Sequence, residues 1–108
     1  METRACSTLM QLDKLVHQLL CEWAVLEPDE SPLRSEVVYR RGRPCGLLYV
    51  VEGPRQIRPS AIWAAEEQRL IVYDSQARRL QELRLQPGPP LAALLSRAEQ
   101  VSALRPAA

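Results

Sequence analysis

The periodicity of the apolar residues changes twice along this chain, and these changes limit the folds open to it. Between residues 8 and 26 apolar side chains recur every three or four positions, the spacing of one helix face. From residue 36 to 85 they alternate or form short continuous runs, which is typical of strands. Helical spacing returns over residues 90–104. The order helix, strands, helix predicts an α+β domain.

We expect the strands to form an antiparallel meander. Short polar turns separate four or five apolar runs between residues 36 and 85, and consecutive strands joined by short turns usually pair. An acidic linker over residues 27–35 joins the first helix to these strands. The predicted fold is therefore a four- to five-stranded antiparallel β-meander with both helices packed on one face. One domain over residues 1–108 is the default for this length.

The segment RRLQELRL at residues 78–85 is compatible with either helix or strand. Ala77, Leu80 and Leu83 have helical spacing, whereas Leu83 and Leu85 alternate as in a strand. The connection between Asp74 and this segment has only three residues, which is typical of a hairpin. We therefore predict a strand.

A polar insert, EGPRQ at residues 52–56, separates two apolar runs. Gly53 permits a positive φ and Pro54 fixes its own φ, so the insert predicts a turn between two paired strands. Arg55 lies at the tip of that turn, and Arg58 lies near the start of the next strand. Whether these two side chains also bind a ligand is left open by the sequence.

Charge is distributed unevenly. Residues 1–33 have two basic and six acidic side chains, a net charge of −4, whereas residues 34–58 have six basic and two acidic side chains, a net charge of +4. Lys14 is the only lysine among 14 basic residues. Selection for the bidentate guanidinium would explain this excess of arginine. Codon usage in a genome rich in G and C would favour the same residues, and it is the favoured explanation.

The arginines of the basic segment form a candidate site for phosphate or RNA. They are Arg40, Arg41, Arg43, Arg55 and Arg58. In a meander, the turns over residues 41–44 and 52–56 lie at opposite ends of a shared strand, so we expect two separate patches. We further expect Arg40 and Arg58 to lie closer together along the strands. The strands contain no RNA-binding signature, and a solvated face with internal ion pairs is the alternative.

The sequence provides little for metal binding or thiol chemistry. Cys6, Cys21 and Cys45 form no CxxC pair, and His17 is the only histidine. His17 and Cys21 are spaced to share one helix face, but a zinc site needs four ligands. We predict no metal site and no cofactor, and we expect reduced thiols in the cytoplasm.

No catalytic motif occurs in the chain, so we predict that it is not an enzyme. It lacks a serine elbow, a Walker loop, a dinucleotide fingerprint and an HExxH helix. An enzyme of unrecognised type would instead bring Tyr39, Tyr49 or Asp74 together in a polar pocket. No apolar run approaches the roughly 20 residues of a membrane span.

The apolar stripe of the first helix has two interpretations. As a seam for a protein partner or a second copy it would use Leu12, Leu15, Val16, Leu19 and Trp23. A helix packed on its own sheet shows the same spacing, and core packing is the favoured interpretation. We expect a small non-catalytic protein-interaction or scaffold domain, with a homodimer as one form. The alternative is an RNA- or phosphate-binding protein.

Overall fold

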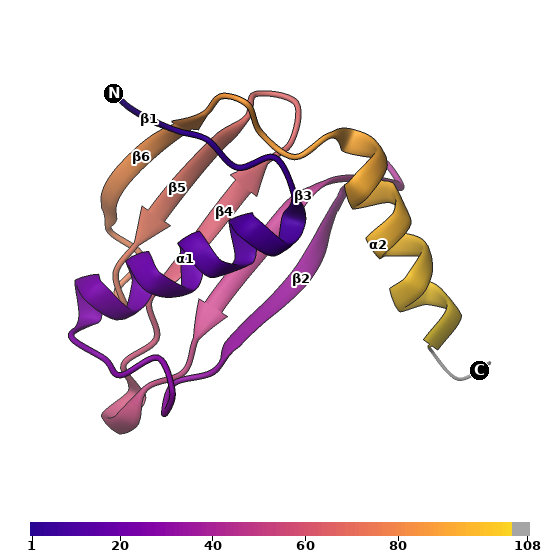
Figure 1. Ribbon diagram of the computed structural model, residues 1–108. Helices are drawn as coiled ribbons and strands as arrows, with labels where there is room; N and C mark the ends of the chain where they lie inside the picture. Colours follow the sequence, from indigo (N-terminus) through magenta and orange to yellow (C-terminus); the bar gives the residue numbers. More distant parts are fainter. Residues whose placement is uncertain (105–108) are drawn as a thin grey trace.

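The protein is a six-stranded sheet with two helices on one face (Figure 1). The structure is a computed structural model and describes residues 1–104; residues 105–108, which the single-domain prediction also includes, lie outside the described part. The elements in chain order are β1 (Glu2–Arg4), α1 (Leu9–Ala24), β2 (Leu33–Arg40), β3 (Arg43–Val51), β4 (Ser60–Ala64), β5 (Arg69–Tyr73), β6 (Arg79–Leu85) and α2 (Leu91–Leu104). The α+β class and both terminal helices are confirmed.

The predicted purely antiparallel sheet is wrong in one respect, because the sheet is mixed. Its strand order is β1-β6-β5-β4-β3-β2, and β2 to β6 form the antiparallel meander. The sixth strand, β1, pairs with β6 in parallel. Three residues are too few to show a period of two. Its pairing extends into long-range hydrogen bonds from Gln86 N to Arg4 O and from Cys6 N to Pro87 O.

Two further boundaries follow from pairing between strands. β2 begins at Leu33, which lies opposite Val51, so the linker predicted over residues 27–35 is shorter than expected. The predicted strand over residues 78–85 is confirmed as β6, which pairs with β5 and buries Leu83 and Leu85. The predicted turn over residues 52–56 includes a single 3-10 turn at Pro54–Gln56.

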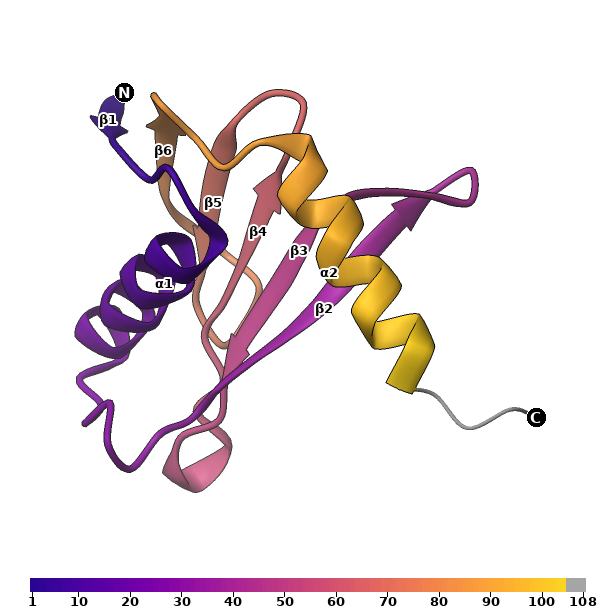
Figure 2. The same ribbon diagram turned by 45° about the vertical axis from the view of Figure 1, so that its right-hand side comes forward.

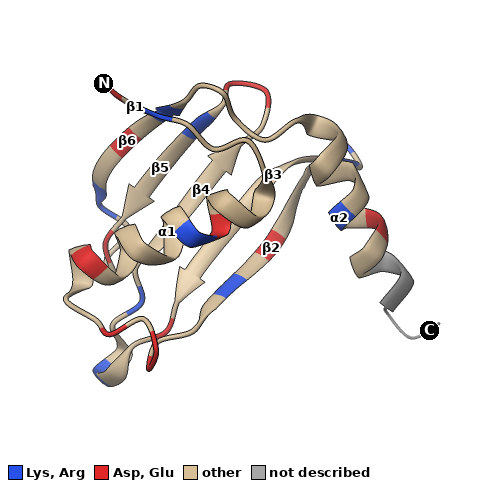
Figure 3. Cartoon of the chain, viewed as in Figure 1, with Lys and Arg blue, Asp and Glu red and all other residues tan. Residues whose placement is uncertain are grey.

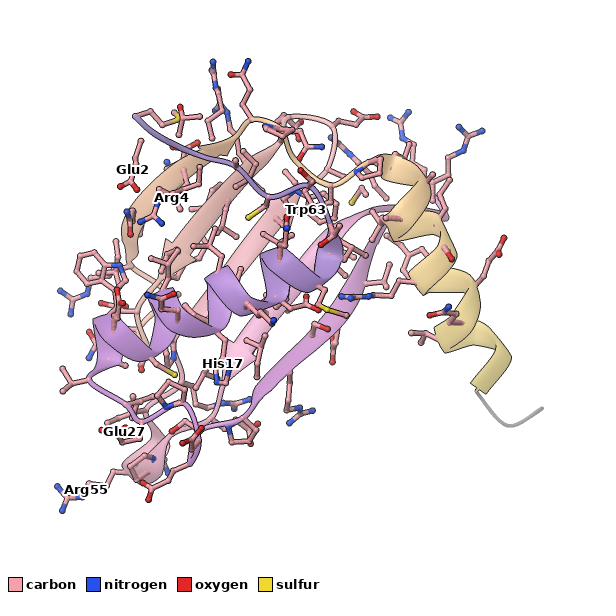
Figure 4. The ribbon with its side chains drawn as sticks, in the orientation of Figure 1. Glu2, Arg4, His17, Glu27, Arg55 and Trp63 are labelled. Atoms are coloured by element: carbon pink, nitrogen blue, oxygen red, sulfur yellow. The ribbon has the colours of Figure 1, made fainter. Side chains whose placement is uncertain are left out.

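The core lies between the two helices and one face of the sheet, here called the covered face. α1 contributes most of its apolar stripe, and Thr8 caps its first turn by accepting a hydrogen bond from Gln11 N. Trp63 is fully buried at the centre of the sheet (Figure 4). The buried side chains of the covered face are Leu47, Tyr49, Val51, Ala61, Trp63, Leu70, Val72, Leu83 and Leu85.

Candidate functional site

A polar network crosses the covered face and joins three elements. Tyr49 of β3 donates its hydroxyl hydrogen to Asp13 Oδ1 of α1 over 2.7 Å. Arg97 of α2 donates to both oxygens of the same carboxylate, at 3.2 and 3.0 Å. Burial, together with the hydrogen bond to Asp13, raises the pKa of Tyr49 far above its ordinary value. The network holds α2 against α1 and the sheet, and its three members satisfy one another.

The three residues expected to converge in an enzyme site lie apart. Tyr49 is buried in this network, whereas Tyr39 lies at the β2–β3 hairpin and is 49% exposed. Asp74 lies after β5, where its Oδ1 accepts hydrogen bonds from the backbone N–H groups of Gln76 and Arg78. These hydrogen bonds lower the pKa of Asp74, and they shape the turn into β6.

The predicted partner-binding stripe of α1 lies largely inside the molecule. Leu12 and Val16 are fully buried, and Leu19 is nearly so, because they pack against the sheet. Leu15 is half-buried, and only Trp23 is exposed, at 47%. The core-packing interpretation accounts for this spacing, since a side chain enclosed by its own sheet cannot also contact a partner.

Small depressions flank α1. One, with a volume of about 120 Å³, lies beside Trp23, whose Nε1 donates to Gln81 Oε1 over 3.0 Å. Its lining residues include Ile57, Pro59, Asp74, Ser75 and Leu80. The other is wider, about 460 Å³, and lies between β1 and the first turns of α1. Its lining includes Arg4, Cys6, Ser7, Gln11 and Lys14.

The candidate anion-binding arginines separate into two groups, as expected for turns at opposite ends of β3. Arg40 pairs with Arg43 across a tight hairpin turn in which Arg41 and Gly42 have φ values of 53° and 77°. Arg55 points outward from the turn at the other end, the lower left in Figure 4. The expected proximity of Arg40 and Arg58 is wrong, because β3 separates them by nearly its whole length, roughly 26 Å at 3.3 Å per residue.

The two groups also differ in their ion pairs. Arg58 and Arg34 both contact Glu52, with N–O distances of 3.4 and 2.7 Å. Among the described residues, no carboxylate lies within ion-pair distance of the hairpin arginines, Arg40, Arg41 and Arg43. The hairpin arginines are therefore the less neutralised group.

The histidine contacts the linker, and two of the three cysteines are buried, as is typical of residues that stabilise a fold. His17 Nε2 lies 2.7 Å from the carbonyl oxygen of Ser31, which ties the linker to α1. Cys6 and Cys21 are buried, and that burial raises the pKa of both thiols and so disfavours the reactive thiolate. Within residues 1–104, no group of three or more His, Cys, Asp or Glu side chains is placed to hold a metal ion.

The second face of the sheet, here called the open face, carries neither α1 nor α2 (Figure 2). A row of apolar side chains crosses its centre, formed by Leu48, Ile62 and Ile71 on three neighbouring strands. Ile62 is the most exposed of the three, at 36%, and the other two are half-buried. On the two outer neighbouring strands, Glu36 lies opposite Leu48 and Glu82 lies opposite Ile71. Glu82 forms an ion pair with Arg69 at 3.2 Å. The aliphatic parts of these charged side chains therefore cover part of the open face.

A different apolar surface lies at the β2 edge of the molecule. α2 buries Leu94 and Ala98, but the side chains of Leu91, Leu95 and Val101 are exposed. In both views of the ribbon the C-terminal half of α2 extends beyond β2 (Figures 1 and 2). The sequence pattern of α2 predicted this apolar stripe, but it gave no means of telling which part the sheet would cover.

Comparisons with protein-family models, with curated proteins and with solved structures found no match to this chain. Neither helix in the described part combines the length and apolar content that crossing a bilayer requires.

Proposed function

We propose that this chain is a non-catalytic protein-interaction domain that acts as a homodimer. The observation that carries the proposal is that α2 exposes three apolar side chains, Leu91, Leu95 and Val101, while its C-terminal half extends beyond the edge strand β2. Exposed apolar side chains that gather on one element can mark an interaction site in a soluble protein. A second copy brings the same surface to the contact, so a two-fold arrangement buries both at once.

The polar groups near this surface support an anchoring role for α2. Arg97 of α2 binds Asp13 of α1, which also binds Tyr49 of β3 (Figure 3). α2 is thereby tied to α1 and the sheet, while three of its apolar side chains stay exposed. A helix fixed in this way presents a rigid apolar side, and rigidity lowers the entropy lost on association. The proposal places the domain in the cytoplasm, where its three thiols remain reduced.

Sedimentation velocity over a concentration series tests the homodimer. We expect a reversible monomer–dimer equilibrium, and we expect Leu95→Glu to shift it to monomer because a carboxylate would be buried in the contact. The matched control is Ile62→Glu, which places the same charge at an exposed position on the open face. Circular dichroism confirms that both variants fold. A wild-type monomer at all concentrations would overturn the proposal, as would loss of the dimer in the control alone.

The hairpin arginines favour a second candidate function, binding of phosphate groups or RNA. Arg40, Arg41 and Arg43 meet no carboxylate among the described residues, unlike Arg34 and Arg58. Binding of this kind weakens steeply with salt, because neutralised phosphates release counterions. Fluorescence anisotropy with a labelled mixed-sequence RNA at low and physiological salt would detect it. Loss of binding in Arg41→Ala but not in Arg55→Ala would assign it to the hairpin.

A further inference from the structure

The outer edge of β2 is regular along all eight residues. β2 pairs with β3 on one side, and among the described residues no strand pairs with its other side. In the pairing of β2 with β3, Val38 lies opposite Gly46 and Tyr39 lies opposite Pro44, so Cys45 of β3 has no partner residue. The bulge therefore lies in β3, and β2 continues without interruption. Pro32 precedes the strand and no proline lies within it. Its outward N–H and C=O groups are therefore open to another strand.

The opposite edge of the sheet differs. There the last strand is β1, which has only three residues, all of them exposed. Short edge strands resist pairing with other chains, whereas a regular edge of eight residues invites it. The structure therefore favours β2 over β1 as the site of strand addition.

The side chains of β2 alternate between the two faces of the sheet. Glu36, Val38 and Arg40 project on the open face, since Glu36 lies opposite Leu48. Val37 and Tyr39 project on the covered face, the side on which α2 lies, since Val37 lies opposite the buried Leu47. Glu36 and Arg40 are both exposed, and neither forms an ion pair within the described part of the chain.

From this arrangement we infer that β2 pairs antiparallel with β2 of a second copy, about a two-fold axis through Val38. The inference rests on the proposed homodimer and specifies which strands of the two copies form the contact. A two-fold axis perpendicular to the sheet keeps the covered faces of both copies on the same side. Glu36 of each copy then lies opposite Arg40 of the other, and Val37 lies opposite Tyr39, so charges and apolar groups are both matched.

Neighbouring symmetric registers match less well. An axis through Glu36 places two carboxylates opposite each other, and an axis through Val37 places Arg34 opposite Arg40; both arrangements are repulsive. An axis through Ser35 uses Arg34, which already binds Glu52, and places Pro32 within the ladder although proline has no N–H to donate. The axis through Val38 avoids all of these conflicts.

The C-terminal half of α2 lies next to the proposed contact between the two β2 strands. Because α2 extends beyond β2 on the covered face, the two α2 helices of such a dimer come together above the joined strands (Figure 2). Leu95 and Val101 then gain a partner surface, and Tyr39, which is half-exposed in the single chain and projects on the same face, packs opposite Val37 of the other copy. One arrangement thus covers residues 36–40 of the edge strand and exposed apolar side chains of α2 together.

A charge-swap series measures this pairing in the full chain. Sedimentation equilibrium gives the dimer Kd for wild type, Glu36→Arg, Arg40→Glu and the double variant carrying both changes. We expect each single change to raise Kd roughly tenfold, because two attractive pairs become repulsive, and the double variant to return close to wild type. Arg84→Glu, at an exposed position of β6 far from this edge, is the matched control and leaves Kd unchanged.

Val38→Cys adds a direct readout, because the two substituted residues face each other across the axis. Mild oxidation should produce a covalent dimer in this variant and not in wild type, whose own cysteines lie elsewhere. A dimer whose Kd is unchanged by both single swaps would overturn the β2 pairing and leave the homodimer standing. A double variant as weak as the single variants would overturn the register. A wild-type chain that never dimerises would overturn both proposals.

Discussion

The two helices have similar apolar patterns in the sequence but different positions in the molecule. α1 lies across the sheet and buries six side chains, Leu9, Leu12, Val16, Leu19, Leu20 and Cys21. α2 buries only Leu94 and Ala98 in the described part and adds Arg97 as a polar anchor. Most apolar residues of α1 are thus core, whereas Leu91, Leu95 and Val101 of α2 remain available for a contact. An amphipathic stripe shows that a face will be covered, but not by which molecule.

The largest expected difference between the helices is in core packing. Leu12→Ala should lower the free energy of unfolding by about 2–5 kcal/mol, because Leu12 is fully buried and its removal leaves a cavity. Leu95→Ala is the matched control on α2 and should cost about 0.5 kcal/mol or less in the monomer. Urea denaturation at a protein concentration below the dimer Kd measures both. Equal losses would contradict the contrast between the helices.

The polar anchor should have a smaller effect that involves both helices. Asp13→Ala removes the acceptor for the Tyr49 hydroxyl and the Arg97 guanidinium, so we expect a loss of about 1–3 kcal/mol. Asp29→Ala, in the exposed linker, is the control and should change stability by about 0.5 kcal/mol or less. If the two aspartates gave the same result in urea denaturation, α2 would be held by its apolar contacts alone.

The anchor also predicts a pH dependence in alkaline solution. The pKa of Tyr49 is raised in the folded protein, so above pH 10 the unfolded chain releases this proton while the folded protein retains it. The raised pKa of Tyr49 contributes fully to the free energy of unfolding below about pH 10. Above that pH the free energy of unfolding falls by about 1.4 kcal/mol per pH unit. Denaturation at pH 9 and pH 11 measures the fall.

Tyr49→Phe should remove that part of the slope, since phenylalanine has no proton to lose. Tyr39→Phe changes an exposed tyrosine and should retain it. An unchanged alkaline slope in Tyr49→Phe would show that the network does not hold the proton of Tyr49.

Much of the architecture was predictable from local patterns. The apolar periods and the turn at Pro54 each depend on neighbours in the chain, so they predicted α1, the meander and α2 close to their observed bounds. The three-residue strand β1 was not predictable, because its partner β6 lies some 80 residues away and three residues show no period.

The amino-acid sequence by itself determined the two helices and the strands of the meander, since periodicity and turn chemistry act over a few residues. Only the tertiary structure decided which apolar residues the chain buries itself. It placed Leu12 and Val16 against the sheet and left Leu95 outside, and it joined Asp13 to Arg97 across 84 positions of sequence. Burial and long-range ion pairs depend on how the elements pack together, and no local pattern contains that information.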